Sequence, residues 1–214
     1  MRVILASSST RRRDWISKQD WMNGHQIEFR SMDIDESRYS TKGDVPTTVR
    51  DIANAKATRA RRDLEVKPND WIALVSDTLV EDPTSGIALG KPHDSKEAEN
   101  MLRSLSGKRH YVHSCTALIT PNQVITWELF SDKSEVFMQP LMDGDLEELV
   151  RTGSWKGKAG GYDIMGLASR HIDISDGDEI TVLGFSSKAV KRLRRVLSVA
   201  VSYTHLRAHE TSDY

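Results

Sequence analysis

The stretch with the clearest chemical character is residues 3–13, which reads Val-Ile-Leu-Ala-Ser-Ser-Ser-Thr-Arg-Arg-Arg. The apolar residues 3–6 are long enough for a buried strand, and the hydroxyl and cationic residues after them are typical of a turn into a helix. A serine or threonine can cap such a helix and leave its free N–H groups facing an anion, while arginine can donate two parallel hydrogen bonds to phosphate. The stretch therefore indicates either a phosphate site or a capped helix with solvated arginines.

Carboxylates occur in two places where they could hold a metal ion. Asp33, Asp35 and Glu36 form a short acidic segment, and Asp77 follows the apolar run 71–75, which predicts a strand buried on both faces. Carboxylates without a matching set of cysteines and histidines suit Mg²⁺ or Mn²⁺, which also bind substrate phosphates. A simpler interpretation stays open, because acidic segments are often solvated and an aspartate after a strand often forms a turn.

The composition limits the classes of function. The 214 residues carry 30 Lys and Arg against 31 Asp and Glu, a net charge of -1 that gives no general attraction to nucleic acid. Cys115 is the only cysteine, which excludes an intramolecular disulfide and fits a reducing compartment. The sequence contains no membrane-spanning apolar stretch, no signal-peptide core and no GxxxxGK[ST] segment. We therefore expect a cytoplasmic protein without nucleic-acid or membrane partners, and not a P-loop enzyme.

Turn residues and hydrophobic periodicity predict the elements that must position these groups. Strands are expected at 3–6, 26–30, 71–75, 111–120, 123–130 and 180–185, with an extended segment at 134–140. Helices are expected at 10–18, from 46 onward, and at 95–105, 143–152 and 188–201. Lys56 falls among the alanines of the second helix, where a lysine is expected to extend toward solvent. Residues 153–162 form a glycine-rich loop, which suits close approach to a ligand or an ordinary mobile loop.

No internal repeat or linker divides the chain, so we expect one domain over residues 1–200. Residues 201–214 break the preceding helical pattern and are expected to be a disordered or non-native tail. His205 and His209 are one helical turn apart and could bind a metal, but a polar tail is the preferred interpretation.

The sequence resembles the Maf-like nucleoside triphosphate pyrophosphatases over nearly the whole chain before residue 201. The matching blocks follow in order and spacing: Leu5-Ala6-Ser7-x-Ser9-x-Arg11-Arg12, Asp35-Glu36, Ala53-x-x-Lys56-Ala57, Ser76-Asp77-Thr78-x-Val80, Gly90-Lys91-Pro92, Met101-Leu102-x-x-Leu105-Ser106-Gly107-x-x-His110-x-Val112, Lys158-Ala159-Gly160-Gly161-Tyr162 and Gly177-Asp178-x-x-x-Val182-x-Gly184. Thr10 stands in place of the proline usual in the first block, and Phe185-Ser186 in place of a Leu-Pro pair.

The resemblance implies an α/β fold of the Maf and ITPase kind, with a mixed sheet, flanking helices and two lobes around a central cleft. It also implies a homodimer, and a hydrolase that uses a divalent metal, Mg²⁺ or Mn²⁺, to convert a nucleoside triphosphate to the monophosphate and pyrophosphate. Asp77 would orient or deprotonate the attacking water, and Glu36 and Asp77 would hold the metal. The residues that would bind the nucleotide are Ser7, Ser9, Arg11, Arg12, Lys56, Thr78, Lys91, Lys158 and Met165.

Three positions distinguish substrate types within the family that the sequence resembles. The dTTP/UTP type has arginine first in the arginine pair, threonine after the catalytic aspartate and glutamine after the glycine loop. Arg11 and Thr78 match, but Met165 takes the place of the glutamine and cannot make an amide's paired hydrogen bonds. None of the tryptophan, glutamine and glutamate of the 7-methyl-GTP type is present. We expect dTTP, UTP or modified pyrimidine triphosphates as substrates, with Arg11 as the specificity contact, Arg12 as a phosphate anchor and Arg13 as a solvated helix residue.

Two other functions are compatible with the sequence. A non-catalytic regulator of cell division or septum formation would bind nucleotides without turnover. A nucleic-acid-binding module would use residues 11–13 and the basic run 191–195. The near-neutral charge and the lack of an aromatic and basic stripe argue against that module.

Overall fold

The computed structural model describes residues 1–31, 34, 36, 39, 44–64, 71–121 and 126–210, with side chains up to residue 199. The strands are β1 (Arg2–Ala6), β2 (Gln26–Arg30), β3 (Trp71–Glu81), β4 (Ala88–Leu89), β5 (Arg109–Thr120), β6 (Thr126–Met138) and β7 (Ile172–Asp176). The α-helices are α1 (Thr10–Ser17), α2 (Val45–Asp63), α3 (Ser95–Leu105), α4 (Asp143–Arg151), α5 (Glu179–Leu183) and α6 (Ser187–Glu210).

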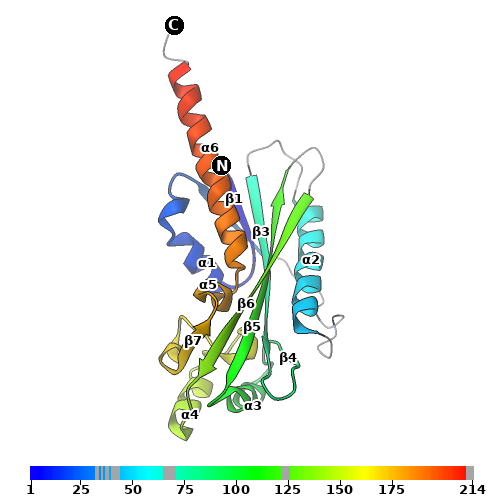
Figure 1. Cartoon of the computed structure of the whole chain (residues 1–214), viewed down its shortest axis with the longest axis vertical. Helices are drawn as coiled ribbons and strands as arrows, with labels where there is room; N and C mark the ends of the chain where they lie inside the picture. The colour runs from blue at the N-terminus through cyan, green and yellow to red at the C-terminus, as the bar shows by residue number, and fades with distance from the viewer. Residues whose placement is uncertain are drawn as a thin grey trace.

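Over the described residues, seven strands form one sheet in the order β2-β1-β3-β5-β6-β7, with β4 paired to β3. The β1 strand pairs in parallel with β2 and β3, whereas β5, β6 and β7 join in antiparallel fashion. The long β5–β6 hairpin runs along the length of the molecule (Figure 1). The predicted α/β fold with a mixed sheet and flanking helices is therefore confirmed.

The sheet is covered on both faces because successive side chains of β1 point to opposite sides. Val3 and Leu5 pack with residues of α6, whereas Ile4 and Ala6 pack with residues of α2. A third cluster joins α3 and α4 to the far ends of β5 and β6. A strand buried on both faces reads as a continuous apolar run, which is why the sequence predicts β1 correctly.

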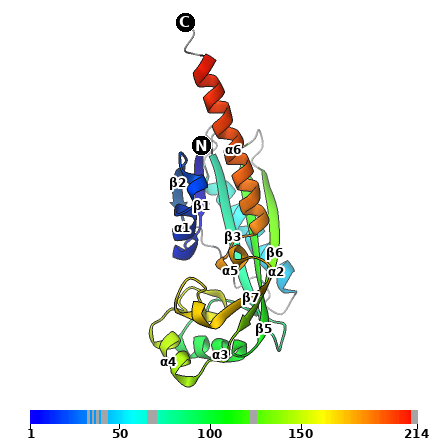
Figure 2. The ribbon, with the colours of Figure 1, turned by 60° about the vertical axis from the view of Figure 1, so that its left-hand side comes forward.

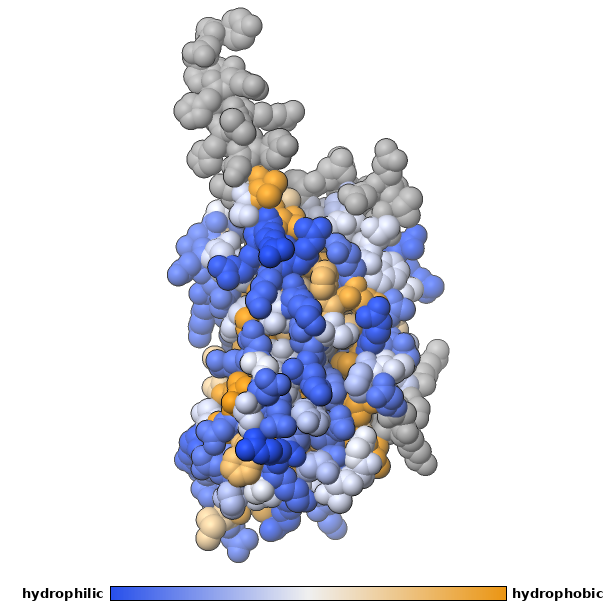
Figure 3. All heavy atoms as spheres, in the orientation of Figure 1, coloured by the Kyte–Doolittle hydropathy of each residue, from blue (hydrophilic) through white to orange (hydrophobic). Residues whose placement is uncertain are grey.

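The molecule has an upper and a lower part. Figure 2 shows α1 and β2 above, with α4 and the segment leading to β7 below, as the two-lobe expectation requires. The face drawn in Figure 3 is mostly hydrophilic, with hydrophobic residues in small separate groups. Within the described part of the chain, no helix is both long and apolar enough to cross a membrane.

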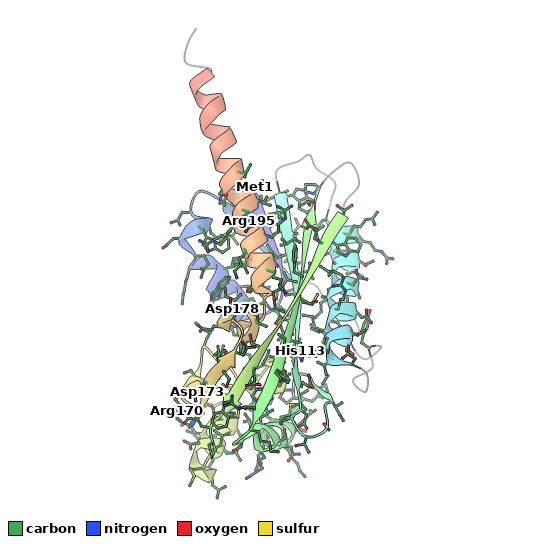
Figure 4. All side chains as sticks on the ribbon, in the orientation of Figure 1. Met1, His113, Arg170, Asp173, Asp178 and Arg195 are labelled. Carbon is green, nitrogen blue, oxygen red and sulfur yellow. The ribbon has the colours of Figure 1, made fainter. Side chains whose placement is uncertain are left out.

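The predicted strand at 180–185 is wrong, because these residues form helix α5 and the turn after it. The Asp178 side chain accepts a hydrogen bond from the Ile180 N–H and caps the helix, and Gly184 ends it with a φ of 122°. Asp178 lies beside the lower end of α6 in Figure 4. A short apolar run does not distinguish a strand from a buried helical turn, and the sequence analysis also missed the neighbouring strand β7.

The strand expected at 26–30 is confirmed as β2, whereas other strands were predicted too short. Residues 126–130 and 134–138 of the two expected segments belong to one strand, β6, whose polar centre pairs in register with β5. Likewise, β3 does not end at residues 76–78 but continues to Glu81. Helix α6 continues to Glu210 instead of ending at 201, since it contains no glycine or proline to stop it.

Candidate functional site

A cavity of about 290 Å³ opens between the two parts of the molecule. It is lined by residues 6–12, Glu36, Lys56, residues 76–78, Lys91 and residues 156–159. The lining thus contains most of the predicted site residues, namely Ser7, Ser9, Arg11, Arg12, Glu36, Lys56, Asp77, Thr78, Lys91 and Lys158. Met165 is not among the lining residues, and 57% of its surface is exposed.

The turn between β1 and α1 is held by its own serines. The Ser9 side chain accepts a hydrogen bond from the Arg12 N–H at 3.4 Å and caps α1, while Ser7 Oγ accepts one from the Ser9 N–H at 3.2 Å. The predicted capped helix start is therefore confirmed, and it also lines the cavity, whereas the phosphate site stays a prediction.

Arg12 is buried and ties three parts of the chain together. Its guanidinium donates to Gly184 O at 2.8 Å, to Ser76 O at 3.1 Å and to Thr78 Oγ1 at 2.8 Å. Burial lowers the pKa of Arg12 to about 10, so it keeps its charge at neutral pH. Arg12 therefore fixes the position of β3 relative to α1, in addition to any contact with a phosphate.

Lys56 is the cation at the centre of the cavity wall. Its Nζ lies 2.6 Å from Asp77 Oδ1 and 2.7 Å from Glu36 Oε1, and only 8% of the residue is exposed. The expectation that Lys56 extends toward solvent is wrong, because two carboxylates hold its ammonium group inside. Burial alone would raise the pKa of Glu36, but the nearby Lys56, together with Lys91 and Arg12, lowers it.

Asp77 lies in the middle of β3 and is 4% exposed. Its Oδ2 is buried and has no hydrogen-bond partner among the described residues. An unpaired buried carboxylate oxygen is costly, so its presence at a cavity wall points to a ligand, a water molecule or a metal ion. Lys91 completes this group from the cavity mouth, with Nζ 3.9 Å from Glu36 Oε1 and half of its side chain exposed.

The carboxylates fit a hard divalent cation. Mg²⁺ is usually held by one or two carboxylates and shares its other positions with water and substrate phosphates, which matches the free Asp77 Oδ2 beside Glu36. Within the described ranges, no group of three or more His, Cys, Asp or Glu side chains is arranged to hold a metal ion. The candidate ligands Asp33 and Asp35 lie outside the described residues.

A second charged group lies beside the first. Asp163 accepts a hydrogen bond from Arg11 Nη1 at 3.3 Å, and its other oxygen is 3.4 Å from Lys158 Nζ. The sequence analysis missed Asp163, although an acidic residue directly after the glycine-rich loop was a usable signal. The expectation of a solvated Arg13 is also wrong, since its guanidinium donates to Ser7 O at 2.9 and 2.7 Å.

The fold and the site define an α/β protein with a cationic cavity and a buried carboxylate that has one unpaired oxygen among the described residues. The sequence matches the profile of the family described as Maf-like protein over residues 2–197, and the chain belongs to this family. It is 35% identical to a dTTP/UTP pyrophosphatase of Pyrococcus furiosus over 86% of this chain and 88% of that protein. It is 34% identical to a dTTP/UTP pyrophosphatase of Pyrococcus horikoshii over 92% and 97%. The solved structure of a HAM1 protein from Coxiella burnetii covers 92% of this chain and 98% of that one, with a TM-score of 0.46 and 16% identity.

Proposed function

We propose that this chain hydrolyses nucleoside triphosphates to the monophosphate and pyrophosphate, with dTTP, UTP or modified pyrimidine triphosphates as substrates. The observation that carries the proposal is the buried Lys56 between Glu36 and Asp77, with one Asp77 oxygen left unpaired. The names of the relatives, which are dTTP/UTP pyrophosphatases, support the same reaction and the same bases.

Asp77 is the group that acts on the attacking water. Because Lys56 occupies Oδ1, Oδ2 is the oxygen left to orient a water molecule toward the α-phosphorus and to accept its proton. In phosphoryl transfer the protein contributes mainly positioning and charge stabilisation. Lys56 therefore has two roles, since it fixes the carboxylate and places a positive charge beside the reacting phosphate.

Lys91 and the start of α1 bind the phosphates. The N–H groups at the start of α1 favour an anion, and the half-exposed Lys91 can follow the pyrophosphate as it leaves. A divalent metal, Mg²⁺ or Mn²⁺, belongs to the proposal as well: Glu36 and Asp77 would hold it, and it would neutralise phosphate charge. A homodimer in the cytoplasm also remains part of the proposal.

The test is pyrophosphate release from a panel of canonical and modified triphosphates, with and without Mg²⁺ or Mn²⁺. Asp77→Asn keeps the side-chain shape but removes the base, so turnover should fall by about 100-fold or more. Asp51→Asn, on the exposed face of α2, is the matched control and should keep full turnover. Wild-type turnover in Asp77→Asn would remove Asp77 from the reaction. Nucleotide binding without turnover in the wild-type protein would support a non-catalytic regulator instead.

A further inference from the structure

Arg11, Asp163 and Lys158 form a charged group that the proposed hydrolysis does not use. The Asp163 carboxylate is held by three donors: Arg11 Nη1 and the Met165 N–H on Oδ1, and Lys158 Nζ near Oδ2. The side chains are largely buried, with 10% of Arg11, 17% of Asp163 and 16% of Lys158 exposed. A carboxylate fixed in this way keeps lone pairs free and stays in one orientation.

This group and the reacting carboxylate belong to the same cavity, since Arg11, Lys158 and Asp77 all line it. The buried Arg12 lies between the two, since it bonds to residues on both sides of Asp77 in β3 and directly follows Arg11 in α1. A substrate with its α-phosphorus at Asp77 would extend from there toward both groups. One therefore receives the pyrophosphate and the other receives the nucleoside.

Charge decides which end receives the nucleoside. Lys56 and Lys91 lie beside the carboxylates that would share a divalent cation with the phosphates. At the other end, Asp163 already neutralises part of the charge of Arg11 and Lys158, and its oxygens repel phosphate oxygens. The Asp163 end is therefore better suited to a neutral base.

The side chains at this end present a donor next to an acceptor. Arg11 can only donate hydrogen bonds, and its buried Nε has no hydrogen-bond partner among the described residues. An ionised aspartate can only accept them. Uracil and thymine carry a ring carbonyl beside a ring N–H, which matches this pair, whereas cytosine carries an amino group beside a bare ring nitrogen and does not.

We propose that Arg11 and Asp163 together read the base, with Arg11 donating to a ring carbonyl and Asp163 accepting from the adjacent ring N–H. Asp163 is thus a specificity-determining residue that selects uracil and thymine over cytosine. The Met165 side chain is exposed and takes no part, although its backbone N–H helps to fix the carboxylate. The inference rests on the proposed function, because it places the reacting phosphate at Asp77.

The experiment compares kcat/KM for UTP and CTP, two substrates that differ only in the base edge. Asp163→Ala should lower kcat/KM for UTP by about 10- to 100-fold, the loss expected for a hydrogen bond to a charged group. The kcat/KM for CTP should change much less, so the ratio of kcat/KM for UTP to that for CTP should fall by a similar factor. Asp163→Asn offers N–H donors in the same shape, and it should shift the ratio further toward CTP. Asp51→Ala changes the net charge by the same amount on an exposed helix face and should leave the ratio unchanged.

An equal loss for both nucleotides, or no loss for either, would overturn base reading by Asp163. Urea unfolding of each variant separates a specificity change from a folding defect, and Asp163→Asn keeps the test available if the alanine variant is unstable. If the wild-type protein releases no pyrophosphate, the proposed function fails. Equilibrium binding of UTP and CTP to the same variants then decides the role of Asp163 independently.

Discussion

His110 makes the stability of this protein depend on pH in a way that can be calculated. It lies on β5, is 2% exposed, and its Nε2 is 2.9 Å from the hydroxyl of Tyr162 in the glycine-rich loop. Burial lowers the pKa of His110 from 6.5 to about 4. The imidazole is therefore neutral in the folded protein at pH 5, but it is protonated at that pH in the unfolded chain.

The sign follows from proton binding. Between pH 6.5 and about 4 the unfolded chain binds a proton that the folded protein does not, so the free energy of unfolding falls as the pH falls. A difference of one pKa unit corresponds to about 1.4 kcal/mol. Lowering the pH from about 7.5 to about 5 should therefore reduce the free energy of unfolding by about 2 kcal/mol through His110 alone. The loss is complete only below pH 4.

Urea unfolding at the two pH values measures this loss. Other groups also titrate in this range, so the comparison is made with His110→Gln, which should lose about 2 kcal/mol less than the wild-type protein over the same interval. Tyr162→Phe removes the hydrogen bond but keeps the buried imidazole, and it should retain the wild-type pH dependence. An equal loss in the wild-type protein and in His110→Gln would refute the reasoning, because the dependence would then come from other groups.

Two further substitutions test the contacts around the cavity. In Gly184→Ala the new Cβ would lie 2.7 Å from Arg12 Nε at a φ of +122°, so the free energy of unfolding should fall by about 2–4 kcal/mol. Gly86→Ala, which has open space around its Cβ, is the control and should lose about 1 kcal/mol. Equal losses of the two variants in urea unfolding would show that Arg12 is not the cause. Lys56→Met leaves Asp77 without its cation, so turnover should fall by about 100-fold in the pyrophosphate-release assay, whereas wild-type turnover would contradict the ion pair's role.

The sequence was informative where chemistry and local pattern coincide. The apolar run before residue 7 predicts β1, and the hydroxyl residues after it predict the capped turn that lines the cavity. The meeting of Lys56 and Asp77 was indicated by the family blocks but not by periodicity. An alanine-rich helix face predicts burial of its alanines, but it does not say that a carboxylate on the facing strand will hold the lysine inside.

One wrong prediction reflects contacts that are distant in the sequence, and another reflects a local helix cap. The polar centre of β6 has the composition of a turn between two strands. Asp132 in this centre accepts hydrogen bonds from the Ser186 hydroxyl and the Lys188 N–H, so the strand continues through it. Similarly, residues 180–183 look like a strand, and Asp178 makes them a helix. Asp132 thus satisfies groups of a remote segment, which no local pattern reports, whereas the Asp178 cap is a local contact with a residue two positions later.

The three consecutive arginines show why residue type alone does not settle function. Neighbouring side chains on a helix point about 100° apart, so Arg11, Arg12 and Arg13 face different surroundings. Arg13 holds the carbonyl of Ser7, and Arg12 fixes β3. Only Arg11 pairs with a carboxylate at the cavity edge while keeping its Nε without a partner among the described residues. Arg12 and Arg13 therefore make structural contacts, and the pairing with Asp163 is what distinguishes Arg11, the residue that we propose reads the base.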